Sequence, residues 1–191
     1  MACSLIAGLA VFFILPDWQG RRLHQVAAAT LRTNSQYLRH IMQEYSLGKT
    51  DDMQYRIARR EAHNANAALS RSLGNMLKEP GHFRRQSETG FEFLLYSHNL
   101  LSYMSALGAH RGNLADAPNY PSLNREAEQP AANREQLASD LEALRPVNPD
   151  CSMEEEQNSR LAAMQVGDDD HLRLLHGQLL LISQQLAPLR K

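Results

Sequence analysis

The residues of this sequence that could do chemistry are basic side chains between positions 56 and 85. A first group, here called the basic strip, lies roughly along one side of a predicted helix and consists of Arg56, Arg59, Arg60, His63 and Arg71. Arg84 and Arg85 follow after a turn. Because a planar guanidinium pairs bidentately with carboxylates and phosphates, these residues, together with Arg21 and Arg22 near the N-terminus, indicate a surface that faces anions or lipids.

Three kinds of anion could meet this surface. They are lipid headgroups, an anionic substrate leaving a pore, and the acidic C-terminal half of the same chain. Nucleic acid is not expected as a partner, because the net charge is −1 and no aromatic residues are interleaved with the basic ones.

The eight histidines do not indicate a metal site. Di-metal sites in helical bundles use a glutamate with a histidine three residues later, whereas Glu61 and His63 are two apart and His171 and His176 are five apart. Asp168 to Asp170 are typical of a helix N-terminus, where negative charge is favourable. The sequence also shows no nucleophile–base arrangement and no glycine-rich phosphate loop, so we expect neither an enzyme nor a bound cofactor or metal.

The N-terminal sequence indicates where the basic residues lie relative to a membrane. An uncharged run from Ala2 to Leu15 ends at Pro16 and is followed by Trp18 and then by Arg21 and Arg22. This order is typical of a helix leaving a bilayer, but the run is shorter than the about 20 residues that a full span needs. We expect residues 1–16 to be the C-terminal part of a transmembrane helix, with Trp18 at the membrane interface. A cleaved secretory signal fits less well, because no charged region precedes the run.

Charge is divided unequally between the two halves of the chain. Residues 17–111 carry 13 basic and 8 acidic side chains, and residues 112–191 carry 7 basic and 13 acidic ones. A basic half next to a membrane exit suits a domain beneath an anionic leaflet. The two cysteines, Cys3 and Cys151, indicate neither a disulfide framework nor a zinc site.

Helical periodicity dominates the remaining sequence. We expect helices over about 17–45, 51–79 and 82–111, an exposed loop over 112–121, a helix opening at Pro130, and two more over about 153–166 and from 168 onward. Leu137, Leu141 and Leu144 should form a buried edge. The predicted fold is all-α, with long antiparallel helices in a bundle: 17–111 form a three-helix basic half, and 112–191 form the acidic helical half of the same domain.

Two apolar stripes predict how individual helices pack. The helix over 51–79 has a stripe of small residues, Ala58, Ala62 and Ala65, which would let another helix approach closely and would place this helix at the centre of the bundle. The last helix has a heptad seam formed by Leu172, Leu175, Leu179, Ile182 and Leu186. Such a seam could pack within the bundle or pair with another subunit.

Several motifs resemble a known family. The stretch from Tyr55 to Ser70, which closes on Asn75-Met76 and Glu79-Pro80, resembles the signature stretch of the YccS/YhfK inner-membrane proteins. These belong to the fusaric-acid-resistance-like (FUSC) superfamily of bacterial exporters. Pro16 to Gln19 and the pairs Leu31-Arg32 and Tyr37-Leu38 fit the exit from that family's final membrane helix.

The resemblance implies a location and a role. Family members have two membrane blocks, each followed by a cytoplasmic helical region, and this chain would correspond to the last part-helix and the C-terminal region. Residues 17–191 would be cytoplasmic, beneath the bacterial inner membrane. The parent protein would export small aromatic or anionic compounds, and this region would serve assembly or gating. Its expected partners are the membrane, the remainder of the transporter and further copies of itself. The alternative is a membrane-anchored helical adaptor or sensor that does not transport.

Overall fold

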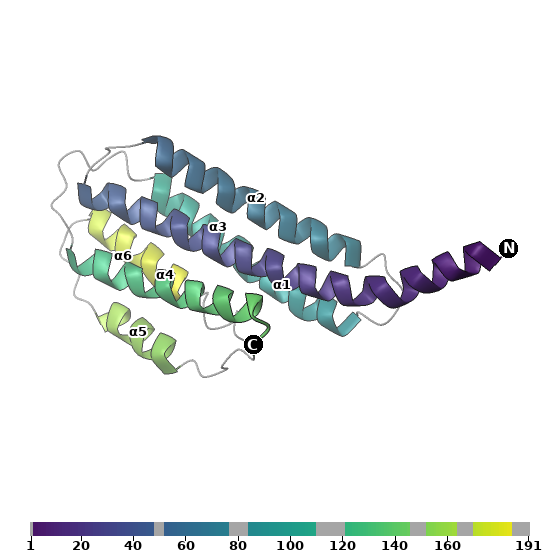
Figure 1. Cartoon of the computed structure of the whole chain (residues 1–191). Helices are drawn as coiled ribbons and strands as arrows, with labels where there is room; N and C mark the ends of the chain where they lie inside the picture. Colours follow the sequence, from purple (N-terminus) through teal and green to yellow (C-terminus); the bar gives the residue numbers. More distant parts are fainter. Residues whose placement is uncertain are drawn as a thin grey trace.

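The computed structural model describes residues 2–47, 52–76, 84–109, 121–145, 152–163 and 170–184. Within these residues all regular structure is helical, and the predicted all-α bundle is confirmed (Figure 1). The helices are α1 (Ala2–Leu47), α2 (Asp52–Met76), α3 (Arg84–Ala109), α4 (Pro121–Glu142), α5 (Ser152–Ala163) and α6 (Asp170–Gln184).

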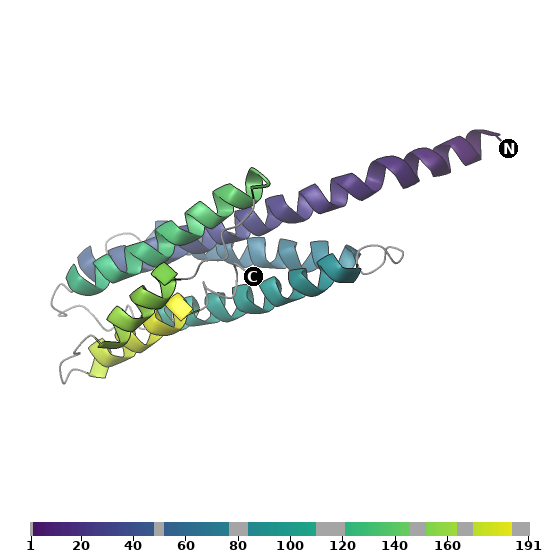
Figure 2. The same ribbon diagram turned by 90° about the horizontal axis from the view of Figure 1, so that it is seen from below.

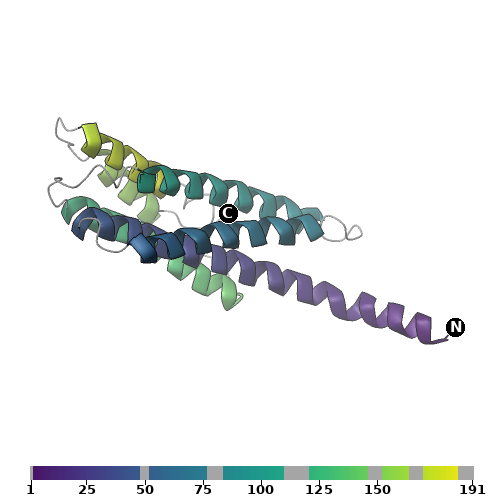
Figure 3. The same ribbon diagram turned by 90° about the horizontal axis from the view of Figure 1, so that it is seen from above.

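The other helices are arranged around α1. It packs against α2, α3 and α4, while α6 packs against α3, α4 and α5 (Figures 1 and 2). The prediction that the helix over 51–79 lies at the centre is wrong, because α2 lies at an edge, beside α1 and α3 (Figure 3). The physical reason is that α2 has one apolar face, with Ala58 and Ala62 buried, while its opposite face carries the exposed basic strip.

α1 is continuous where the sequence predicts two helices. Separate helices were expected over residues 1–16 and about 17–45, divided at Pro16, but α1 runs without a break from Ala2 to Leu47. Its N-terminal end extends past the ends of the other helices (Figures 1 and 2). As far as the structure describes the residues, none of the helices has both the length and the apolar character that crossing a membrane requires.

The prediction that Pro130 opens a helix is wrong. α4 begins at Pro121, and Pro130 lies inside it. Proline is favoured at the first helical position because its missing N–H would have no helical partner there, and Pro121 takes that place. Pro130 is buried in the part of α4 that packs along α1, next to the buried Ala131. Ser35 of α1 donates a hydrogen bond to the carbonyl oxygen of Ala131 at 2.9 Å, which ties the two helices together at this point.

The predicted buried edge of α4 ends one turn early. Leu137 is buried and Leu141 is half-buried, but Leu144 is 53% exposed. The helix closes with two hydrogen bonds, from the Leu144 N–H to the Leu141 carbonyl at 3.2 Å and from the Arg145 N–H to the Asp140 carbonyl at 2.9 Å. This is the Schellman arrangement, which places one residue in the left-handed conformation. Leu144 occupies it, with φ of 51°, so its side chain leaves the apolar face.

The core consists of one large and two smaller clusters. Five helices, α1 to α4 and α6, contribute to the large cluster. Its largest buried side chains include Tyr37, Leu38, Ile41, Leu100, Met104 and Leu107. The seam of the last helix faces this cluster: Leu175, Leu179 and Ile182 are at most 2% exposed. The described part of the seam therefore packs within the bundle.

A buried polar layer connects α1, α2 and α3. Ser97 of α3 donates a hydrogen bond to Oδ1 of Asn66 at 3.0 Å and accepts one from Nδ2 of Asn34 at 3.4 Å. Thr30 donates to the Val26 carbonyl at 2.8 Å. Because buried polar atoms are costly without partners, this layer favours one register of the three helices.

Arg134 of α4 is fully buried. Its Nη2 donates a hydrogen bond to the carbonyl oxygen of Ile182 at 3.2 Å, whereas Nε and Nη1 have no acceptor in the described part of the chain. Burial lowers the pKa of its guanidinium to about 9. Sequence reasoning gave no sign of this residue, because a lone arginine within an amphipathic helix is typical of an exposed position.

Candidate anion-binding site

The side chains of the basic strip lie on the outer face of α2. Arg56, Arg59, Arg60, His63 and Arg71 are all exposed. The opposite face is buried, with Tyr55, Leu69 and Leu73 at most 2% exposed. At 1.5 Å per residue, the strip is about 22 Å long from Arg56 to Arg71. A single phosphate or small anion cannot bridge that length, so for such ligands the parts of the strip are separate.

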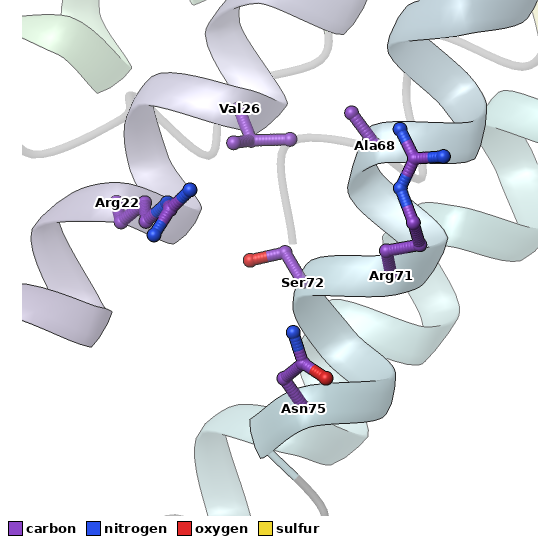
Figure 4. A pocket seen from close by; sticks show the side chains of 6 residues that line it. All are labelled: Arg22, Val26, Ala68, Arg71, Ser72 and Asn75. Carbon is purple, nitrogen blue, oxygen red and sulfur yellow. The ribbon is translucent and has the colours of Figure 1, made fainter.

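The structure brings one member of the strip together with an arginine of α1. A pocket of about 260 Å³ lies between α1 and α2, where it is lined by Arg22, Val26, Ala68, Arg71, Ser72 and Asn75. Arg22 comes from α1, and Ser72 points across the gap toward it from α2 (Figure 4). Val26 and Ala68 supply an apolar part of the wall (Figure 4).

The pocket wall is rich in hydrogen-bond donors. Arg22 and Arg71 each supply a guanidinium, Ser72 a hydroxyl and Asn75 a carboxamide. No carboxylate is among the described lining residues. The field in the pocket is therefore positive, and its chemistry suits an oxyanion.

The pocket lies at the end of the bundle from which α1 extends. Arg22 is one turn beyond Trp18 along α1, and Arg71 to Asn75 are in the last two turns of α2. Because α1 and α2 are antiparallel neighbours (Figure 1), Arg56, Arg59 and Arg60 lie toward the other end of the bundle.

His63 contributes little charge to the strip near neutral pH. Partial burial, the nearby Arg59 cation and His98 of α3 all lower its pKa below the ordinary value of 6.5. At pH 7 the imidazole is therefore mainly neutral, and the positive charge of the strip is carried by its arginines.

Acidic side chains of the C-terminal half form ion pairs with arginines of α1 that are not part of the basic strip. Arg39 of α1 pairs with Glu128, at 2.7 Å from Nη2, and with Glu135, while Arg32 pairs with Glu142. The hydrogen bonds to Glu128 and Glu135 raise the pKa of Arg39 above its ordinary value. Sequence reasoning missed these pairs, although a signal was present: both the two arginines and the three glutamates recur every seven residues, the spacing of facing helix edges.

The side chains of several predicted site residues lie outside the described part of the structure. The side chains of Trp18, Arg21, Arg84 and Arg85 are not among the described ones, although their backbones belong to α1 and to the start of α3. In the described part of the chain, no group of three His, Cys, Asp or Glu side chains could hold a metal ion.

Comparisons with known proteins identify relatives in bacteria. The chain is 44% identical over 111 residues to an uncharacterized protein of Haemophilus influenzae and 41% identical over 111 residues to the inner membrane protein YccS of Escherichia coli. It is 36% identical over 104 residues to the uncharacterized protein ORF2 of Neisseria gonorrhoeae. No family model matches the chain, and no solved structure matches it.

The similarity covers only part of each protein. The first two matches cover 58% of this chain and 16% of the relative, and the third covers 54% and 25%. The predicted resemblance to YccS is confirmed over that stretch, and it supports a location at the inner membrane.

Proposed function

We propose that this chain, a homologue of the Escherichia coli inner membrane protein YccS over part of its length, forms the cytoplasmic helical region of an exporter of the FUSC type. The exported compounds would be small and aromatic or anionic. The region itself is non-catalytic and serves assembly or gating. Homology to an inner membrane protein supports the membrane location.

The observation that carries this proposal is the continuity of α1. A single helix joins the apolar run that ends at Leu15 to Tyr37, Ile41 and Tyr45 in the core of the bundle. Because an α-helix is stiff along its axis, a tilt or shift of the apolar end would move the helix on which α2, α3 and α4 pack. Such a connection is what coupling between a membrane domain and the bundle requires.

The charge around the end of the apolar run supports a cytoplasmic side for the bundle. Arg21 and Arg22 follow the run closely, and residues 17–111 carry more basic than acidic side chains. Basic residues next to membrane helices favour the cytoplasmic side. The bundle would then hang beneath the inner membrane.

Assembly with further copies would use surfaces other than the α6 seam, since the described seam residues are buried. Phe91 and Leu95, one turn apart on α3, are 39% and 58% exposed. They are the kind of large apolar side chains that an interface between subunits would cover.

The location is tested by expressing the full chain with a tag after Lys191 in a bacterial host. We expect it in the inner-membrane fraction, with the tag cleaved by protease in inverted vesicles and protected in intact spheroplasts. Recovery in the cytosol after high-speed sedimentation, or cleavage from the outside of spheroplasts, would contradict the proposal.

The transport role is tested by reading the DNA upstream of Met1. An open reading frame that continues upstream through many apolar segments is expected for an exporter. A genuine start at Met1 would refute the exporter role and favour a membrane-anchored helical adaptor or sensor instead.

A further inference from the structure

We propose that the pocket between α1 and α2 is a specific binding site for a phosphate group. Arg22 and Arg71 would hold the phosphate oxygens, Ser72 and Asn75 would complete the hydrogen bonding, and Val26 and Ala68 would contact the substituent. The phosphate can belong to a lipid headgroup or to a free phosphate compound. The lipid source rests on the membrane location proposed above, whereas the chemistry of the pocket does not.

The donor set matches a phosphate better than a carboxylate. A phosphate has three or more oxygens that accept hydrogen bonds in different directions, and the pocket offers donors from two helices on facing walls. Two guanidinium groups can each bind two of these oxygens. At about 260 Å³, the pocket has the volume of several water molecules, each of which occupies about 30 Å³ in the liquid. There is therefore room for the group and part of its substituent.

Arg22 is expected close to the outer border of the headgroup layer. Arg22 is seven residues beyond Leu15, which corresponds to about 10 Å along a helix. The headgroup region extends about 5 to 8 Å beyond the hydrocarbon core on each side of a bilayer. If the apolar run ends at the edge of the core, Arg22 lies just beyond the headgroup region, and its long side chain can extend back toward lipid phosphates.

The pocket lies far along α2 from the other arginines of the basic strip. Arg60 is eleven residues before Arg71 on α2, so it lies about 16 Å farther from that end of the bundle. That distance exceeds the Debye length of about 8 Å at physiological ionic strength. Arg59 and Arg60 therefore serve as matched controls, because they are exposed arginines of the same helix but lie away from the pocket.

The first experiment uses soluble probes. The full chain in neutral detergent is titrated with inorganic phosphate and with glycerol phosphate while the arginine Nε–H signals are followed by NMR. We expect Arg22→Gln/Arg71→Gln to weaken binding by about tenfold or more and Arg59→Gln/Arg60→Gln to change it less than twofold. Both double variants remove the same charge. Ser72→Ala/Asn75→Ala, which removes none, should also weaken binding, by severalfold.

The second experiment identifies the source of the phosphate. Co-sedimentation is compared between vesicles of phosphatidylcholine alone and vesicles that also contain phosphatidic acid. If the ligand is a headgroup, the preference for phosphatidic acid falls in the Arg22→Gln/Arg71→Gln variant and persists in the Arg59→Gln/Arg60→Gln variant. If that preference is equal in both variants while soluble binding is lost only in the pocket variant, the site takes a free phosphate compound.

Two results would overturn the proposal. One is an equal loss of soluble binding in both arginine double variants with no effect of Ser72→Ala/Asn75→Ala, because binding would then follow net charge alone. The other is no response of the wild-type chain to either soluble probe or to phosphatidic acid. Neither result affects the membrane location, which fractionation of the wild-type chain tests separately.

Discussion

The hydroxyl oxygens of Tyr37 and Tyr55 lie 3.1 Å apart in the buried centre of the bundle, and their ring centroids are 5.6 Å apart. This hydrogen bond joins α1 to α2. Gly108 of α3 closes the site from the third side, since a Cβ at that position would lie 2.4 Å from the Tyr55 hydroxyl and 3.2 Å from that of Tyr37. Three helices therefore meet at the tyrosine pair.

Gly108→Ala should destabilise the bundle even though alanine is the better helix former. The new methyl group would collide with a hydroxyl that buried neighbours hold in place, and such overpacking costs about 1–3 kcal/mol. Gly177→Ala is the matched control, because no atom lies within 4 Å of its added Cβ. It should raise the free energy of unfolding by up to about 1 kcal/mol. Urea denaturation followed by circular dichroism measures both, and a stabilising Gly108→Ala would show that the three helices are not tightly packed there.

Tyr37 should make stability fall at high pH. Burial, followed by the hydrogen bond between the Tyr37 and Tyr55 hydroxyls, raises its pKa above the ordinary value of 10.0. Above pH 10 the unfolded chain loses this proton while the folded chain keeps it, so the folded state is disfavoured as pH increases. Tyr37→Phe has no such proton. The difference in unfolding free energy between the wild type and Tyr37→Phe should therefore shift in favour of the variant above pH 10, and a difference independent of pH would contradict the expectation.

Pro130→Ala should stabilise α4. Proline inside a helix removes a backbone hydrogen bond and costs about 3 kcal/mol relative to alanine. Replacing Pro130 also removes the contacts of its buried ring, which offsets part of that gain in stability. We expect a net gain of about 1–2 kcal/mol in unfolding free energy. Pro121→Ala is the comparison, since the first helical position needs no N–H donor, and it should change stability little. Destabilisation by Pro130→Ala alone would mean that the ring or the bend it imposes is needed for α4 to follow α1.

Arg134→Met should leave the fold intact and make it more stable. Because the Arg134 guanidinium has no counter-ion among the described residues, replacing it by an apolar side chain of similar length should gain about 1–4 kcal/mol, as replacement of buried ion pairs often does. Arg134→Lys keeps the charge but cannot reach the Ile182 carbonyl with the same geometry, so it should be less stable than the wild type. Thermal unfolding compares the three proteins. If Arg134→Met unfolds at a lower temperature than the wild type, the guanidinium makes a larger favourable contribution than its single acceptor indicates.

The spacing of apolar residues predicted the helices and most of their buried faces, because a helix that buries one face needs apolar side chains at every third or fourth position. The inward positions Ala58, Ala62, Leu137 and Leu179 could all be placed in this way. Leu144 could not, since the same three- and four-residue spacing continued past the point where hydrogen bonding ended the helix. Pro130 was misplaced because packing against α1 outweighs the local cost of proline.

The candidate site was predictable in composition but not in arrangement. The arginines were identified, yet the placement of Arg22 and Arg71 around one pocket depends on the register between α1 and α2. That register is fixed by contacts such as Tyr37 with Tyr55 and by the buried layer around Asn66. Such contacts join residues that are far apart in the sequence, and a single sequence carries no direct record of them.

The outermost position of α5 sets the order in which this fold would open. α5 packs chiefly against α6, through residues such as the buried Leu161, so releasing it exposes little of the large core cluster. Local opening free energies follow the apolar area that is uncovered. Amide protons of α5 should therefore exchange with solvent long before those of the buried part of α1 around Tyr37 and Ile41, and a protease would reach this helix while the remaining bundle is still folded.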